Sequence, residues 1–260
     1  MRLAVELTPQ DQMYWKPSDQ YKLHGRLWND LEGTKYETLH DDSKTPTFCF
    51  SNIFPTNKKT HHEQVLNPQD NCLLFISSPH PGLLDSLSAS FDQNRTLHIG
   101  DNRFTVTDVQ SRDEDIGRVG SAGTLKTQTG VYLRLPQEKQ KEYNIETPYE
   151  NSTISWTPDM GYTAFRERLL ENARYKTNQL CLKTSSHPQE FSDLFTSTEI
   201  LTTFEADVNV TQDYTFKFFP SIVELEYTVT SEDQRMWLNT LLDTGLGWKN
   251  ALGFGFLNKQ

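Results

Sequence analysis

The sequence predicts an α+β protein with two tandem domains, each with the order strand, helix, strand, strand, helix, strand. Short segments with alternating apolar residues, typical of half-buried strands, flank longer segments with helical spacing. The same order begins again after a charged segment in which the apolar residues have no regular spacing. The length of 260 residues suits two domains of roughly 100 to 150 residues each.

The first half opens with a strand over residues 2–7, in which every second residue is apolar. The tripeptide Pro17-Ser18-Asp19 is a helix-start signal, and the apolar face of that helix continues to Leu31. A second strand is predicted over residues 47–54, where Pro55 ends it.

The first half continues with residues 57–69, which are polar and predict an exposed turn. Residues 72–77 are a short apolar run and predict a third strand, and Pro81-Gly82 opens a second helix. Residues 96–110 predict a hairpin that turns at Gly100-Asp101-Asn102. This order is the ferredoxin-like arrangement.

The second half repeats the order. Residues 123–135 alternate as a strand does, and Thr157-Pro158-Asp159 predicts a helix with threonine as its cap. Residues 200–210 and 214–229 predict a strand pair, with Pro220 at a bulge or an edge. We therefore expect an N-terminal domain over 1–112, a linker over 113–121 and a C-terminal domain over 122–260.

Composition excludes several classes. No run approaches the ~18 apolar residues of a membrane span. The first seven residues are too short and too alternating for a signal peptide. The scattered Cys49, Cys72 and Cys181 lack metal-ligand spacing and suit a reducing compartment. We expect a cytoplasmic protein without a membrane partner.

The net charge of −10 argues against nucleic acid, because RNA-binding proteins are usually basic. Binding, however, depends on a local patch of charge. An acidic surplus also fits a protein that works in concentrated salt, where the attraction between phosphates and cations is screened. The composition thus leads to the hypothesis of a halophilic source.

The C-terminus carries the most informative pattern. Ser231-Glu-Asp-Gln234 is a capping box for a helix that extends to Asp243. Four glycines follow within eleven positions, at 245, 247, 253 and 255. Glycine ends helices, and it also lets a backbone approach another chain and present N–H groups to an anion. Leu252, Phe254 and Phe256 then alternate, which predicts a final buried strand.

This pattern resembles the glycine-rich loop of the CRISPR repeat-processing endoribonucleases, whose signature G-x-G-x-x-N-x-x-G-F-G-F is matched at every fixed position by residues 245–256. Two ferredoxin-like domains in tandem are also that family's architecture. Related CRISPR structural subunits carry similar loops, so the motif indicates the superfamily better than the activity. A helix cap followed by a hairpin without a ligand is the structural alternative.

The resemblance implies metal-independent cleavage of CRISPR repeat RNA without a cofactor. The 2′-hydroxyl beside the scissile phosphate attacks it and leaves a 2′,3′-cyclic phosphate and a 5′-hydroxyl. The family's catalytic histidine follows the first helix, shortly before the second strand, and His40 occupies that place. Lys44 lies near the position of a lysine found in many members. Some members place a second proton-transfer group, a tyrosine, where this chain has Trp28.

RNA contacts are expected at several places. The loop contributes its four glycines together with Lys249 and Asn250. Trp28 is a core residue or a stacking partner for a base, and His24 is an exposed helical residue or part of the same cleft. Arg166, Arg168 and Arg174, with Lys176 just after, give the densest cationic helix, whose alternative is a solvated face.

Three functions remain open. The leading one is a nuclease that matures CRISPR precursor RNA and stays bound to the mature crRNA. The second is a non-catalytic RNA-binding subunit that assembles with other CRISPR effector subunits, which the missing tyrosine favours. The third is a double ferredoxin-like protein without an RNA role, which the net charge alone supports.

Overall fold

The computed structural model describes residues 1–16, 19–40, 47–56, 64–145, 153–181, 194–211 and 214–260, with the backbone alone at 40, 64, 181, 207–211 and 214–216. The chain divides into two compact units. Unit 1 holds Met1–Asp115 and Ala251–Gly253, and unit 2 holds Ile116–Asn250 and Phe254–Gln260. The division falls within the segment expected as a linker. No pattern in the sequence predicts that Ala251–Gly253 belong to unit 1.

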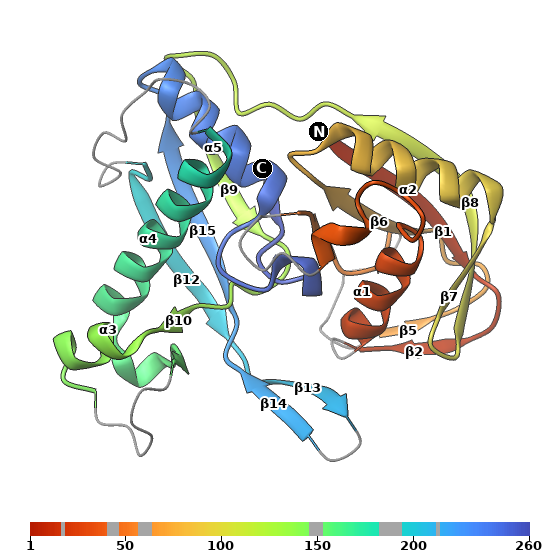
Figure 1. Cartoon of the computed structure of the whole chain (residues 1–260), viewed down its shortest axis with the longest axis horizontal. Coiled ribbons are helices and arrows are strands. Elements are labelled where there is room, and N and C mark those ends of the chain that lie inside the picture. Colours follow the sequence, from red (N-terminus) through yellow and green to blue (C-terminus); the bar gives the residue numbers. More distant parts are fainter. Residues whose placement is uncertain (17–18, 41–46, 57–63, 146–152, 182–193, 212–213) are drawn as a thin grey trace. The chain divides into compact units, whose positions relative to one another are not determined.

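Unit 1 is built on a six-stranded sheet in the order β3-β6-β1-β8-β7, with β4 also paired to β6. Every pairing is antiparallel. Figure 1 shows α1 and α2 in front of this sheet. The elements are β1 (Arg2–Pro9), α1 (Asp19–Asn29), η1 (Glu37–His40), β3 (Cys49–Phe50), β4 (Phe54–Pro55), β6 (Cys72–Ser77), α2 (Pro81–Gln93), β7 (Thr96–Ile99) and β8 (Asn102–Arg112).

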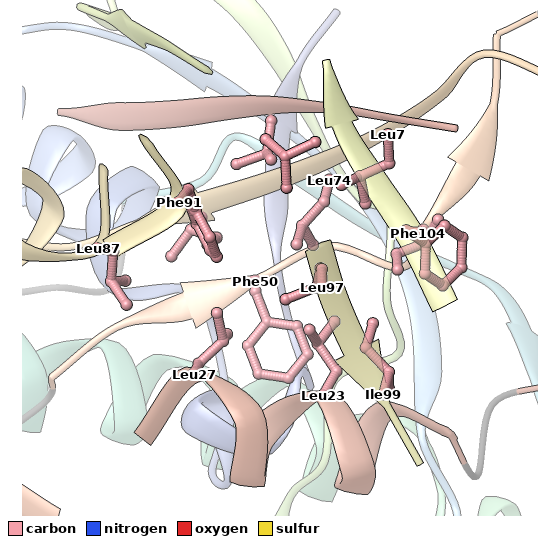
Figure 2. Close-up of a cluster of buried hydrophobic side chains, with 14 of the residues drawn as sticks. Leu7, Leu23, Leu27, Phe50, Leu74, Leu87, Phe91, Leu97, Ile99 and Phe104 are labelled. Atoms are coloured by element: carbon pink, nitrogen blue, oxygen red, sulfur yellow. The ribbon is translucent and has the colours of Figure 1, made fainter. Parts of the chain in front are cut away.

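The core of unit 1 lies between the sheet and the two helices (Figure 2). Leu23 and Leu27 of α1 and Leu87 and Phe91 of α2 point toward Phe50 and the other strand residues, and all five are fully buried. Because burial of each large apolar side chain contributes roughly 1.5–3 kcal/mol, this layer fixes the positions of both helices on the sheet.

Unit 2 has a four-stranded sheet in the order β12-β15-β9-β16. Its pairings are antiparallel, and α4 and α5 cover one face (Figure 1). Smaller elements surround it. The bounds are β9 (Ala122–Thr127), β10 (Arg134–Leu135), α3 (Gln137–Glu142), β11 (Ile154–Ser155), η2 (Pro158–Met160), α4 (Tyr162–Cys181), β12 (Ser197–Thr203), β13 (Ala206–Thr211), β14 (Tyr214–Phe218), β15 (Ser221–Thr228), α5 (Glu232–Thr244), η4 (Asn250–Leu252) and β16 (Leu257–Lys259).

The two sheets share one topology. Of the four strands that make up the ferredoxin-like order, the first, β1 or β9, lies between the third, β6 or β15, and the fourth, β8 or β16. A helix follows the first and the third of these strands. This is the ferredoxin-like arrangement, so the predicted fold class is confirmed. None of the helices in the described ranges combines the length and apolarity needed to cross a bilayer.

Several predicted elements differ from the structure in detail. Within residues 57–69, expected to form an exposed turn, β5 (Gln64–Leu66) pairs with β2 (Met13–Trp15), and Leu66 is fully buried. Strands of three residues are too short for an alternating pattern to stand out.

The first helix of the second half was expected to begin directly after its cap, Thr157. A short 3₁₀ helix starts there instead, and α4 begins only at Tyr162 because Gly161 adopts a φ of 84°. The final strand was expected over the alternating residues 252–256. Residues 250–252 form η4, and β16 begins at Leu257. The alternation arises because glycines separate two buried phenylalanines within a loop.

Candidate nucleic-acid interface

The C-terminal loop begins where α5 ends. At the other end of α5, the side chain of Ser231 accepts a hydrogen bond from the backbone N–H of Gln234 at 3.1 Å, as the capping box predicts. After Thr244 the chain turns at Gly245, which has a φ of 71° and donates its N–H to Leu241 O at 2.8 Å. Glycine therefore terminates the helix at low strain.

Gly247 and Gly255 lie where the loop passes close to other backbone. Their φ angles are 73° and 71°. A Cβ at Gly247 would lie 2.5 Å from Tyr132 O, and one at Gly255 would lie 1.8 Å from Leu246 O. Both glycines are buried, and the N–H of Gly255 donates to Gly130 O at 3.0 Å. Close packing within unit 2 thus accounts for glycine at these positions.

Asn250 and Lys176 hold the loop together from inside. The Asn250 amide donates to Leu246 O and Phe254 O at 2.9 and 2.8 Å. Its Oδ1 accepts from Lys176 Nζ at 2.5 Å, and the same ammonium donates to Gly245 O at 2.7 Å. Lys176 is 3% exposed, so it belongs neither to a cationic face of α4 that could contact RNA, as the sequence predicted, nor to the alternative, a solvated face. A cation at the carbonyl end of α5 is also favoured by the helix dipole.

Residues 251–253 pack within unit 1. The Nδ1 atom of His24 on α1 lies 2.6 Å from Ala251 O. A carbonyl only accepts, so Nδ1 carries a proton. A Cβ at Gly253 would lie 2.6 Å from Cε2 of the buried Phe50 ring. His24 is therefore a half-buried side chain that positions the loop, and the sequence did not predict this contact.

Between these anchored glycines, Trp248 and Lys249 form a turn that reaches solvent. Trp248 is half-buried and Lys249 is exposed. Lys249 has a φ of 64°, a left-handed conformation that few residues other than glycine adopt. Partial desolvation of its ammonium and, next, the charge of Arg134 lower the pKa of Lys249 below its ordinary value. The turn thus holds a lysine whose charged form is disfavoured.

Arg134, at the start of β10, lies beside this turn. Its guanidinium carbon is 5.8 Å from the centroid of the Trp248 ring, which is a cation–π contact. The Tyr175 ring of α4 packs against Trp248 from 5.5 Å with a tilt of 38°. The backbone N–H of Trp248 donates to Tyr132 O at 2.8 Å. The two aromatic rings and β10 therefore hold the cations of Arg134 and Lys249 near each other.

The arginines that the sequence placed on α4 have different environments. Arg168 donates from Nε to Arg134 O at 2.9 Å and forms an ion pair with Glu171. Arg166 is half-buried, and Arg174 is exposed. The expected cationic stripe is therefore partly engaged in contacts within unit 2.

Comparison with known proteins identifies the family. The family model described as "CRISPR associated protein Cas6, C-terminal" matches residues 118–259. A curated relative, the "CRISPR-associated endoribonuclease Cas6" of Haloferax mediterranei, is 32% identical over 259 residues, which cover 99% of this chain and 93% of the relative. The chain belongs to the Cas6 family. The source of this relative also accords with the halophilic origin predicted from the acidic composition.

A second curated Cas6 relative, the "CRISPR-associated endoribonuclease Cas6 2" of Methanocaldococcus jannaschii, is 24% identical over 265 residues and covers 99% of both chains. Solved structures give the same fold. One titled "CRISPR associated protein Cas6" has a TM-score of 0.73 at 20% identity, and "An RAMP protein binding different RNA substrates" has 0.75 at 17%. Both matches cover 100% of this chain and 99% of the other.

The catalytic residues implied by the Cas6 resemblance lie at the edge of the described structure. His40 ends η1, and its side chain lies outside the described part, as does all of Lys44. Trp28 is 9% exposed and its ring lies 5.1 Å from that of Phe48, so it is a core residue. Within the described ranges no cluster of three or more acidic, histidine or cysteine side chains has metal-binding geometry.

Sequence reasoning missed Arg134, Tyr175 and Trp248. Trp248 occupies a variable position of the Cas6-like loop signature, and Arg134 lies in a segment expected only to be a strand. Tyr175 directly follows Arg174, and only the charge of Arg174 was considered as a sign of RNA binding. Only the tertiary structure brings these three residues together, so no local pattern could have indicated them.

Proposed function

We propose that this Cas6-family protein is an endoribonuclease that cuts CRISPR repeat RNA into mature crRNA. The observation that carries the proposal is the 32% identity to a curated CRISPR-associated endoribonuclease over 99% of the chain. The loop signature at residues 245–256 supports it, because the structure builds that segment with buried glycines and an exposed cation.

The reaction we propose needs no metal. His40 takes the proton of the 2′-hydroxyl that attacks the adjacent phosphorus, because an imidazole exchanges protons near neutral pH. Lys44 supplies positive charge to the phosphorane oxygens, which lowers the energy of the transition state. The 5′-oxygen leaves and takes up a proton, so the products carry a 2′,3′-cyclic phosphate and a 5′-hydroxyl. The glycines give the loop its shape, and Lys249 contacts the RNA.

One observation favours a second candidate, a non-catalytic RNA-binding subunit of a CRISPR effector complex. Trp28 stands where some family members place a proton-transferring tyrosine, and it is buried in the core of unit 1. An indole transfers no protons at neutral pH. The chain therefore offers one fewer proton-transfer group than those members have.

Cleavage of synthetic repeat RNA in EDTA and concentrated KCl distinguishes the candidates. The wild type should yield a cyclic phosphate and a 5′-hydroxyl, identified by mass spectrometry. His40→Ala should slow cleavage by about 10²- to 10⁴-fold and retain binding, because one general acid–base group contributes about that factor. His98→Ala is the matched control, since His98 is an exposed residue of β7.

The possible outcomes distinguish the nuclease from the non-catalytic subunit. Binding without any cut by the wild type supports the effector subunit. A cut that requires divalent metal contradicts the mechanism, and equal losses in His40→Ala and His98→Ala contradict the role of His40. Absence of binding at every salt concentration overturns both candidates.

A further inference from the structure

Residues 248 and 249 carry two features that are energetically unfavourable. The first is the left-handed backbone of Lys249, with a φ of 64°. Such a conformation at a residue with a Cβ is strained, and strained residues are enriched at functional sites. The next residue, Asn250, belongs to a type that tolerates this conformation more readily.

The second feature is the indole N–H of Trp248. Its nitrogen is buried and has no hydrogen-bond acceptor in the described part of the chain. A buried donor without an acceptor is destabilising. The indole ring keeps this position although its N–H is unpaired there, and it lies against the Arg134 guanidinium.

The third feature is uncompensated positive charge. Among the described residues, neither Arg134 nor Lys249 forms an ion pair with an aspartate or a glutamate. They are close enough for the charge of Arg134 to lower the pKa of Lys249. The protein carries 35 acidic residues against 25 basic ones, yet none of the described acidic side chains pairs with these two cations.

The site is also rigid. Arg134 pairs with Ser155 in the register of β10 and β11, and its carbonyl accepts from Arg168. Trp248 forms an isolated β-bridge with Tyr132. Lys249 O accepts from Phe254 N at 3.4 Å. Cations on fixed backbone lose little conformational entropy when they bind an anion, which makes the site suitable for recognition.

We propose that Arg134, Trp248 and Lys249 form a phosphate-binding subsite that holds one phosphodiester group of the RNA strand. The two cations donate to its oxygens, and the Trp248 ring supports the Arg134 guanidinium. Arginine suits this position because its planar donors match a phosphate and its plane stacks on an aromatic ring. The subsite rests on the proposed function, since an RNA-processing protein supplies the phosphodiester.

Fluorescence anisotropy tests the subsite with 2′-O-methyl repeat RNA, which lacks the attacking hydroxyl. Arg134→Gln and Lys249→Met should each weaken binding by roughly 10- to 100-fold, because charge-assisted hydrogen bonds contribute about 1.5–3 kcal/mol. Each should also reduce the slope of log K against log [KCl] by about 1, as expected for one lost phosphate contact. Lys217→Met is the control, because Lys217 is exposed and pairs with Glu205 at 2.5 Å. It should change neither quantity.

The indole N–H provides a second readout. In an NMR spectrum of the protein's five tryptophans, the signal lost in Trp248→Phe identifies Trp248. RNA bound at Arg134 should shift that signal, because the guanidinium lies against the ring. Inorganic phosphate at constant ionic strength should neither reproduce the shift nor displace RNA. If phosphate does both, the occupant is a free anion and the RNA subsite is overturned.

The variants also separate this inference from the proposed function. If the wild type binds and cuts repeat RNA while Arg134→Gln and Lys249→Met behave like Lys217→Met, the subsite is wrong and the nuclease stands. If the wild type binds no repeat RNA, both are wrong. Circular dichroism of each variant checks that it folds, and Arg134→Lys, which keeps the charge, should recover part of the affinity.

Discussion

Five residues of the C-terminal loop have a left-handed backbone, and they divide into two kinds. Four are the glycines at 245, 247, 253 and 255. They are buried, and at the last three a Cβ would collide with protein atoms. The fifth is Lys249, which is exposed and carries a long charged side chain in the same conformation. The comparison teaches that glycine occurs where packing leaves no room for a side chain, whereas Lys249 combines a strained backbone with an exposed charged side chain.

The largest effect is expected for Gly255→Ala, which tests whether packing requires glycine in the loop. Its Cβ would meet the backbone oxygen of Leu246 at 1.8 Å, and backbone cannot move as a flexible side chain does. Strain and overpacking together should lower the free energy of unfolding by about 4 kcal/mol. Urea unfolding monitored by hydrogen exchange in unit 2 measures this. A loss below about 1 kcal/mol would mean that the loop rearranges easily.

Gly253→Ala should have a smaller effect. The added Cβ would lie 2.6 Å from the Phe50 ring and 3.3 Å from Cδ of Gln20, and both neighbours are side chains. We expect a loss of about 2 kcal/mol, seen in the hydrogen exchange of unit 1. If Gly253→Ala costs more than Gly255→Ala, the distinction between backbone and side-chain collisions does not hold here.

Lys249→Gly should act in the opposite direction. Glycine removes the backbone strain but adds freedom to the unfolded chain, so we expect a net gain of about 0.5 kcal/mol. RNA affinity should fall in the same variant. Lys249→Asn is the companion variant, since asparagine tolerates the conformation and lacks the charge. A loss of stability in both would show that Lys249 supports the fold.

The smallest effect concerns pH. The lowered pKa of Lys249 means that the folded state disfavours the ammonium, chiefly through desolvation and next through Arg134. The resulting cost is complete below the folded pKa and disappears as pH rises toward the unfolded value of about 10.5. Lys249→Met should therefore be more stable than the wild type at neutral pH, and this advantage should shrink as pH rises and be lost above about 10.5. Urea unfolding of both proteins at neutral pH and above about pH 10.5 measures this difference in stability. A difference that grows with pH would contradict the prediction.

Sequence reasoning predicted what local patterns encode. The alternation of β1, the proline at the start of α2 and the capping box of α5 gave the ferredoxin-like order of both units. It failed where three-dimensional contacts decide. Lys176 was counted with exposed cations, although its ammonium binds carbonyls at the end of α5. Arg134 and Trp248 are separated by more than a hundred residues, and tertiary contacts such as the β-bridge between Tyr132 and Trp248 bring their segments together.

Single-turnover cleavage of repeat RNA tests the central claim most directly, that imidazole chemistry at His40 acts on RNA held by the glycine-shaped turn. Rates measured over a range of protein concentrations separate the maximal rate from the half-saturating concentration. We predict that His40→Ala removes the maximal rate and leaves half-saturation in place. The double variant Arg134→Gln/Lys249→Met should raise half-saturation more than it lowers the maximal rate. A wild-type protein that saturates with repeat RNA and never cuts it would contradict the account.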